Sequence, residues 1–218
     1  MTTLVQFDQV KTNNLIQVNR LKGTSYAVMD FEYGDDFHIT NFSIVIYSKN
    51  GKVLKRFNEW ALDGRQSKAA QETTLHKTGK WLTPNSKGYT EVLFKFNNFI
   101  LENGIGTRIP LMGWGVSRDV TSYATVMANF MYSKAPLKES DVMKIPLYDL
   151  QEMLSSDLYV TPLSLEVACG FFNLEYPGEH VGATDVEAIS KVYWRLQEFL
   201  ISTGRTQKYD LYQFSDEE

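Results

Sequence analysis

The stretch SYAVMDFEYG, residues 25–34, combines a short apolar run with two acidic side chains. The run predicts a buried β-strand that ends in Asp30 and Glu32. Residues two apart on an extended strand point to the same face, so the two carboxylates are expected to lie together. Burying them is costly unless they are paired or bind a metal ion. Taken alone, such a pair is more often a solvated pair at the edge of a loop.

Two further strand-like runs follow, at residues 42–47 and 53–57, with Asn50-Gly51 between them. Asn-Gly favours a tight hairpin turn because both residues tolerate positive φ. Three antiparallel strands are therefore expected within residues 25–61.

The rest of the chain alternates helical and strand-like patterns. Helices are predicted at residues 90–103, 119–128, 147–154 and 185–201, and strands at 109–114 and 142–146. Thr184 and Glu187 have the spacing of a capping box at the start of the last helix. Together these elements predict an α/β fold with a mixed five-stranded sheet, in which parallel strands are added to the three antiparallel ones, and with helices on both faces.

The length of 218 residues fits one domain with a full core. We expect an N-terminal extension at 1–24, a domain at 25–204 and a C-terminal tail at 205–218. The extension is compatible with an added edge strand or with a helical arm.

The composition is that of an ordinary globular protein, with 43% hydrophobic and 22% charged residues. It contains neither a membrane-spanning run nor the pattern of a signal peptide, so a cytoplasmic protein without a membrane partner is expected. The lone Cys169 cannot form an internal disulfide and is predicted to be a small buried hydrophobe. The net charge of −4 argues mildly against a protein that coats nucleic acid, but not against an enzyme that acts on it.

Further acidic residues follow at places where the same sheet could collect them. Asp119 comes after the predicted strand at 109–114, and His180 and Asp185 flank the start of the last helix. Taken singly, Asp119 could be a helix cap, Asp185 could serve the helix dipole, and His180 could be a surface residue. The small residues Gly182 and Ala183 would let the histidine loop lie close to the sheet.

These residues, taken in order, resemble the DEDDh 3′–5′ exonucleases, the DnaQ-like group within the RNase H-like superfamily. The first motif of that family resembles residues 26–32, the second 113–119 and the third 180–185. The resemblance covers roughly residues 24–200. Trp114-Gly115 is more similar to the ERI-like branch, which trims RNA ends, than to proofreading subunits. Tyr33-Gly34 departs from the Thr-Thr-Gly or Ala-Thr of many members, so the family's contacts to the terminal sugar are not carried over to these residues.

The resemblance implies a two-metal hydrolysis of phosphodiesters. Two divalent ions, Mg²⁺ or Mn²⁺, would be held about 4 Å apart by the four acids Asp30, Glu32, Asp119 and Asp185. His180 would be the general base toward the attacking water, since its pKa range suits that task. The expected products are nucleoside 5′-monophosphates, released from 3′ ends of single-stranded DNA or RNA.

The sequence leaves several roles open. Phe31, Tyr33 and Gly34 are candidates for contacting the terminal nucleotide, although an aromatic residue within a strand is as often part of the core. Lys77, Lys80, Trp81 and Lys87 could guide the strand, while a solvated loop is the favoured interpretation. His38 and His76 receive no role. A homodimer, or a polymerase or other nucleic-acid enzyme as partner, is compatible with the chain, and a non-catalytic binding or scaffolding protein on the same fold is the alternative function.

Overall fold

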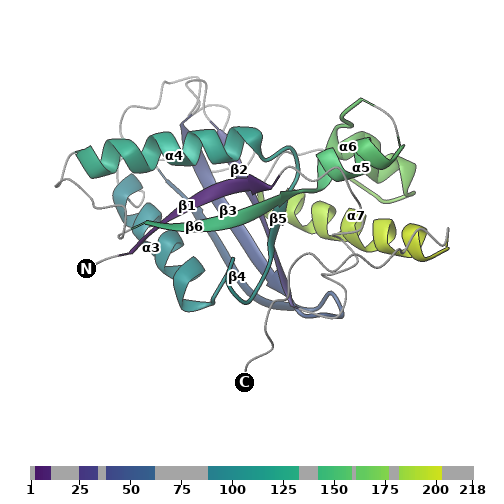
Figure 1. The fold of residues 1–218 in the computed structure, drawn as a ribbon, viewed down its shortest axis with the longest axis horizontal. Helices are drawn as coiled ribbons and strands as arrows, with labels where there is room; N and C mark the ends of the chain where they lie inside the picture. Colours follow the sequence, from purple (N-terminus) through teal and green to yellow (C-terminus); the bar gives the residue numbers. More distant parts are fainter. Residues whose placement is uncertain are drawn as a thin grey trace.

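The computed structural model describes residues 3–10, 25–33, 38–61, 88–132, 142–158, 161–176 and 182–202. Within these ranges the chain forms a six-stranded mixed sheet with helices packed on it (Figure 1). The strands are β1 (Leu4–Val10), β2 (Tyr26–Tyr33), β3 (Ile39–Tyr47), β4 (Val53–Trp60), β5 (Leu111–Gly113) and β6 (Val142–Asp149), in the spatial order β1-β6-β5-β2-β3-β4. The helices are α3 (Tyr89–Glu102), α4 (Ser117–Tyr132), α5 (Leu150–Leu158), α6 (Leu165–Phe171) and α7 (Gly182–Ser202).

The three antiparallel strands expected from the sequence are confirmed as β2, β3 and β4. The turn between β3 and β4 is closed by backbone bonds of Ser48 to Gly51 and Lys52, and Gly51 has a φ of +76°. This backbone conformation is one that L side chains rarely adopt, which explains the glycine. On the other side of β2, the strands β5 and β6 add in parallel.

The prediction of five strands is wrong, because residues from the expected N-terminal extension add a sixth. β1 pairs in parallel with β6 along its whole length, from Leu4 opposite Val142 to Val10 opposite Tyr148. The side chain of Asn97 fixes this strand to α3, since it accepts from the Val5 amide at 2.7 Å and donates to the Thr3 carbonyl at 3.0 Å. The strand β1 is therefore part of the folded domain. The expected boundary at residue 24 does not divide β1 from the rest of the sheet.

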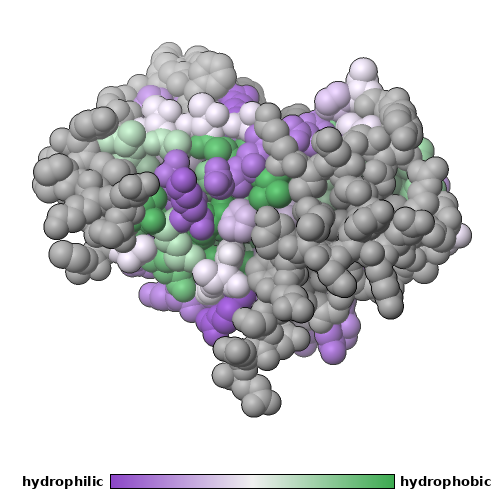
Figure 2. Space-filling view, viewed as in Figure 1, coloured by the Kyte–Doolittle hydropathy of each residue, from purple (hydrophilic) through white to green (hydrophobic). Residues whose placement is uncertain are grey.

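Alternation along β1 suits an edge position. Val5 and Phe7 are buried, whereas Gln6 and Asp8 are exposed. Figure 2 shows hydrophilic and apolar side chains next to one another on the face that carries β1 and β6. One side of the strand therefore supplies the core and the other remains in solvent.

The helices cover both faces of the sheet, as expected. Helices α3 and α4 pack on one face, where Phe96 and Tyr123 meet Phe7 and Phe31 from the sheet. Helices α5, α6 and α7 pack on the other face. Cys169 is buried in this second core, as predicted from its apolar neighbours.

Several predicted boundaries differ from the structure. β6 continues to Asp149, so α5 begins three residues later than expected. α7 begins at Gly182, which places Thr184 inside the helix; the predicted capping box is therefore wrong. The short helix α6 was not expected, although its N-cap Ser164 accepts a bond from the Val167 amide at 3.2 Å. Within the described ranges, no helix has both the length and the apolar composition that crossing a membrane requires.

Candidate functional site

Asp30 and Glu32 lie on the face of the sheet that α7 covers. Strand alternation places them with Tyr26 and Val28 of the second core, whereas Met29 and Phe31 point into the first core. Asp30 is half-buried and Glu32 is 6% exposed. The two carboxylates thus share one side of β2, as the Asp-x-Glu spacing predicts.

The start of α7 brings a third carboxylate to this pair. Gly182 lies so close to β3 that a Cβ there would be 2.5 Å from Oδ1 of Asn41 and 3.0 Å from Oγ of Ser43. Asp185 follows in the first turn and is 5% exposed. Carboxylate oxygens of Asp30, Glu32 and Asp185 all lie within 4.8 Å of one another. Acids 155 residues apart in the chain therefore meet at one end of β2.

Asp119 approaches the same place from α4. Together with the three acids it lines a cleft of about 320 Å³ that also includes Tyr33, Trp114 and Arg118. Its carboxylate lies outside the group of mutually close oxygens. The Tyr33 hydroxyl donates to Asp119, and the Arg118 guanidinium lies 4.1 Å from the centre of the Tyr33 ring. Tyr33 thereby links the fourth acid to the end of β2.

Burial raises the pKa of Asp119 to about 7. The hydrogen bond from Tyr33 and the charge of Arg118 act in the opposite direction, whereas Asp149 and Glu32 raise the value further. A carboxyl with such a pKa is partly protonated at neutral pH. A cation placed beside it would lower this pKa and favour the charged form, which is the form that binds the cation.

This pKa predicts the pH dependence of stability in the metal-free protein. A folded-state pKa raised from 3.8 to about 7 means that the folded chain holds the Asp119 proton more tightly than the unfolded chain does. The stability that the Asp119 carboxyl contributes is fully present below its ordinary pKa of 3.8. It is lost as the pH rises from that value to about 7. We expect the melting temperature in EDTA to fall across the window in the wild type and to fall less in Asp119→Asn. Parallel curves for the two proteins, measured by thermal unfolding at stepped pH, would contradict this.

Two residues that the sequence analysis did not single out hold the site in place. The Tyr176 hydroxyl donates to Oδ1 of Asp185 at 3.0 Å, and burial raises the Tyr176 pKa, so the group remains a donor. Asp149 is 2% exposed and accepts from the amides of Gly115 and Val116, each at 3.0 Å. These bonds fix the loop that leads into α4 and Asp119.

A signal for Asp149 was present in the sequence. An aspartate just before a helical pattern is typical of an N-cap, and Asp149 does accept from the Gln151 amide at 3.0 Å. The predicted helix began at Leu147, which placed Asp149 inside it and hid this signal. Nothing in the sequence around Tyr176 distinguishes it.

The expected nucleotide contacts have different outcomes. The Phe31 ring is 3% exposed and packs against Phe42, Phe96 and Tyr123. Of the two interpretations left open for Phe31, these contacts favour the core role, although the residue also borders the acidic cleft. Tyr33 borders the cleft, and its hydroxyl donates a hydrogen bond to Asp119.

The other predicted residues lie outside the described ranges. These are Gly34, His180, His76 and the group Lys77, Lys80, Trp81 and Lys87.

Comparison of the chain with models of protein families found no match, and comparison with curated proteins found none either.

Proposed function

We propose that this chain is a metal-dependent 3′–5′ exonuclease of the DEDDh type, which releases nucleoside 5′-monophosphates from single-stranded DNA or RNA. The observation that carries the proposal is the meeting of carboxylate oxygens from Asp30, Glu32 and Asp185 within 4.8 Å, with Asp119 lining the same cleft. A sheet of three antiparallel strands followed by two parallel ones supports an RNase H-like core, with β1 as an addition at its edge.

The donor set fits hard divalent cations. It consists of carboxylate oxygens, which Mg²⁺ and Mn²⁺ prefer, and close packing of three acids is costly without positive charge between them. Asp30, Glu32 and Asp185 would hold such ions, together with Asp119 from the other side of the cleft. When bound, two ions would supply charge stabilisation for the attacking and leaving oxygens of a phosphodiester.

The protein's own side chains have distinct tasks in this proposal. Tyr176 and Tyr33 orient the carboxylates of Asp185 and Asp119 by donating to them. Arg118 lines the cleft and offers a guanidinium to the phosphate of the terminal nucleotide. His180, five residues before Asp185, would act as the general base that accepts a proton from the attacking water.

The test is incubation of 5′-labelled DNA and RNA strands with the protein and Mg²⁺ or Mn²⁺. We expect strands that shorten one nucleotide at a time from the 3′ end, release of 5′-mononucleotides, and complete inhibition by EDTA. A circular single strand is the matched control, because it has no end and should stay intact. Absence of shortening in both DNA and RNA under both metals would overturn the proposal, and binding without shortening would favour the non-catalytic alternative.

A further inference from the structure

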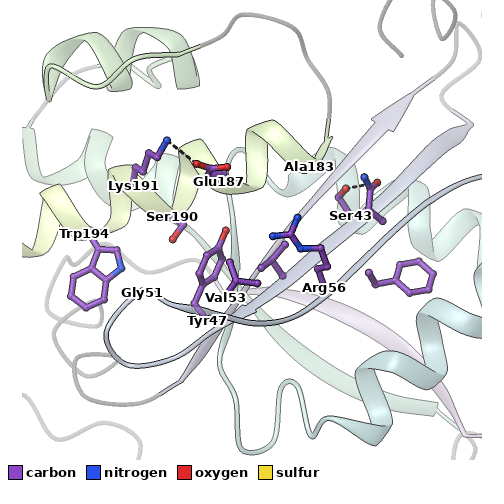
Figure 3. Close-up of a pocket in the computed structure, with 13 residues that line it drawn as sticks. Ser43, Tyr47, Gly51, Val53, Arg56, Ala183, Glu187, Ser190, Lys191 and Trp194 are labelled. Carbon is purple, nitrogen blue, oxygen red and sulfur yellow. Dashed lines mark hydrogen bonds and ion pairs between the residues drawn. The ribbon is translucent and has the colours of Figure 1, made fainter. Parts of the chain in front are cut away.

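A second cavity, of about 330 Å³, lies between α7 and the strands β3 and β4 (Figure 3). Helix α7 packs on β2 and β3, and the cavity opens where the sheet continues to β4. Its volume falls in the roughly 300–1,000 Å³ range of ligand sites. We refer to it as the α7–β4 groove.

One end of the α7–β4 groove adjoins the acidic cleft. Ser43, which lines the groove, is the cross-strand partner of Asp30. Side chains at paired positions of antiparallel strands lie about 5 Å apart. Ala183, on the opposite wall, precedes Asp185 by two residues. The start of α7 packs on Ser43 at Gly182 and lies between the cleft and the groove, so a polymer with its end at the acids would reach this groove by passing the N-terminus of that helix.

The middle of the groove carries a cation, Arg56, that has no acidic partner among the described residues. Arg56 is exposed on β4, and Figure 3 shows its guanidinium directed into the space below α7. Among the residues that the structure describes, no carboxylate forms an ion pair with it. The other charged groups of the groove, Lys191 and Glu187, pair with each other at 2.9 Å. The described part of the lining thus has one excess positive charge, and it belongs to arginine, which binds phosphate in bidentate fashion.

An aromatic ring lies at the far end. Trp194 is partly exposed, and its Nε1 donates to the Tyr26 hydroxyl at 2.7 Å. The β3–β4 turn packs tightly against it, since a Cβ on Gly51 would lie 2.9 Å from Nε1. The ring is therefore held in one position, with part of its surface facing the groove, as a stacking platform for a base requires.

We propose that the α7–β4 groove binds the single strand upstream of the terminal nucleotide, with Arg56 on a phosphodiester and Trp194 against a base. This rests on the proposed exonuclease function and adds the path of the substrate to it. The acids, Arg56 and Trp194 follow one another in this order. A strand with its 3′ end at the acids would present the scissile phosphodiester, the next phosphodiester and a base in the same order.

The neighbouring residue on β4 supplies a matched control. Lys55 points to the opposite face, where its Nζ donates to Oδ1 of Asn103 at 2.6 Å. Arg56→Glu and Lys55→Glu change the net charge equally, and both positions are exposed, so neither variant is expected to unfold the protein.

The first readout is hydrolysis of substrates of two lengths. With an oligothymidylate of about 12 nucleotides, we expect Arg56→Glu to reduce kcat/KM about tenfold and Lys55→Glu by less than about twofold. The single phosphodiester of a dinucleotide is the scissile one, which leaves none for Arg56, so its turnover should change less than about twofold in both variants. If the wild type is active and the two variants have equal effects on the oligonucleotide, the proposed role of the groove in binding the strand is overturned. The exonuclease function would remain in place.

The second readout does not need hydrolysis. In EDTA, the fluorescence anisotropy of a labelled oligothymidylate measures binding alone. The logarithm of the binding constant decreases with the logarithm of the salt concentration, and this slope should become less steep by about 0.7 in Arg56→Ala but not in Lys55→Ala. If the wild type releases no nucleotides and this difference persists, the groove stands and the exonuclease function falls. Identical slopes for the wild type and both variants would overturn the groove.

Discussion

Asp30→Asn is expected to reduce mononucleotide release by roughly 10³-fold or more, because it removes one charge from acids that act as a unit. The Asp30 carboxylate is within 4.8 Å of those of Glu32 and Asp185, and it borders the cleft that Asp119 also lines. The amide keeps the size of the side chain and loses the charge that a divalent cation requires. The measurement is the rate of 3′-end shortening in Mg²⁺ and in Mn²⁺.

The control for this variant is Asp8→Asn, which makes the same chemical change at an exposed position of β1. It should retain full activity. Because Asp30 is half-buried beside two other acids, Asp30→Asn should also melt in EDTA at the wild-type temperature or above it, which excludes unfolding as the cause of lost activity. Activity of Asp30→Asn close to that of the wild type would contradict the assignment of the metal ligands.

Asp149→Ala is expected to lower the free energy of unfolding by about 3 kcal/mol or more. The carboxylate accepts from the amides of Gly115, Val116 and Gln151, all at 3.0 Å, and it is 2% exposed. Its removal leaves buried donors unsatisfied and uncaps α5. The loop before α4 would lose its anchor, so the proposed nuclease activity should fall as well, through displacement of Asp119.

Ser164→Ala is the matched control, because it removes a single capping bond at the start of α6 and should cost about 1 kcal/mol. Denaturant unfolding of the two variants measures the difference. Equal losses of stability would show that Asp149 acts only as a helix cap. Full activity in Asp149→Ala would contradict its role in positioning the loop that leads to Asp119.

Patterns within short segments predicted the strand that carries the first two acids and the face on which they lie. The spacing of Asp30 and Glu32 was sufficient to place both on one face, because side chains of a strand alternate regardless of what packs around them. The hairpin at Gly51 and the buried face of α3 follow from equally local rules. The boundary errors at Leu147 and Thr184 arose where two local signals overlapped, since each segment fits both the end of one element and the start of another.

The resemblance implied that Asp185 would meet the first two acids, as it does, but the residues that hold the acids in place were not predicted. Sequence alone indicated the strand that carries the first two acids, the antiparallel hairpin beside it, and the helices around them. The tertiary structure decided that Leu4–Val10 completes the sheet, that Tyr33 and Tyr176 hold two of the acids, and that Arg56 faces a groove next to them. The physical reason is that periodicity is carried by neighbouring residues, whereas these contacts depend on strand order and register, which bring together side chains with no shared pattern.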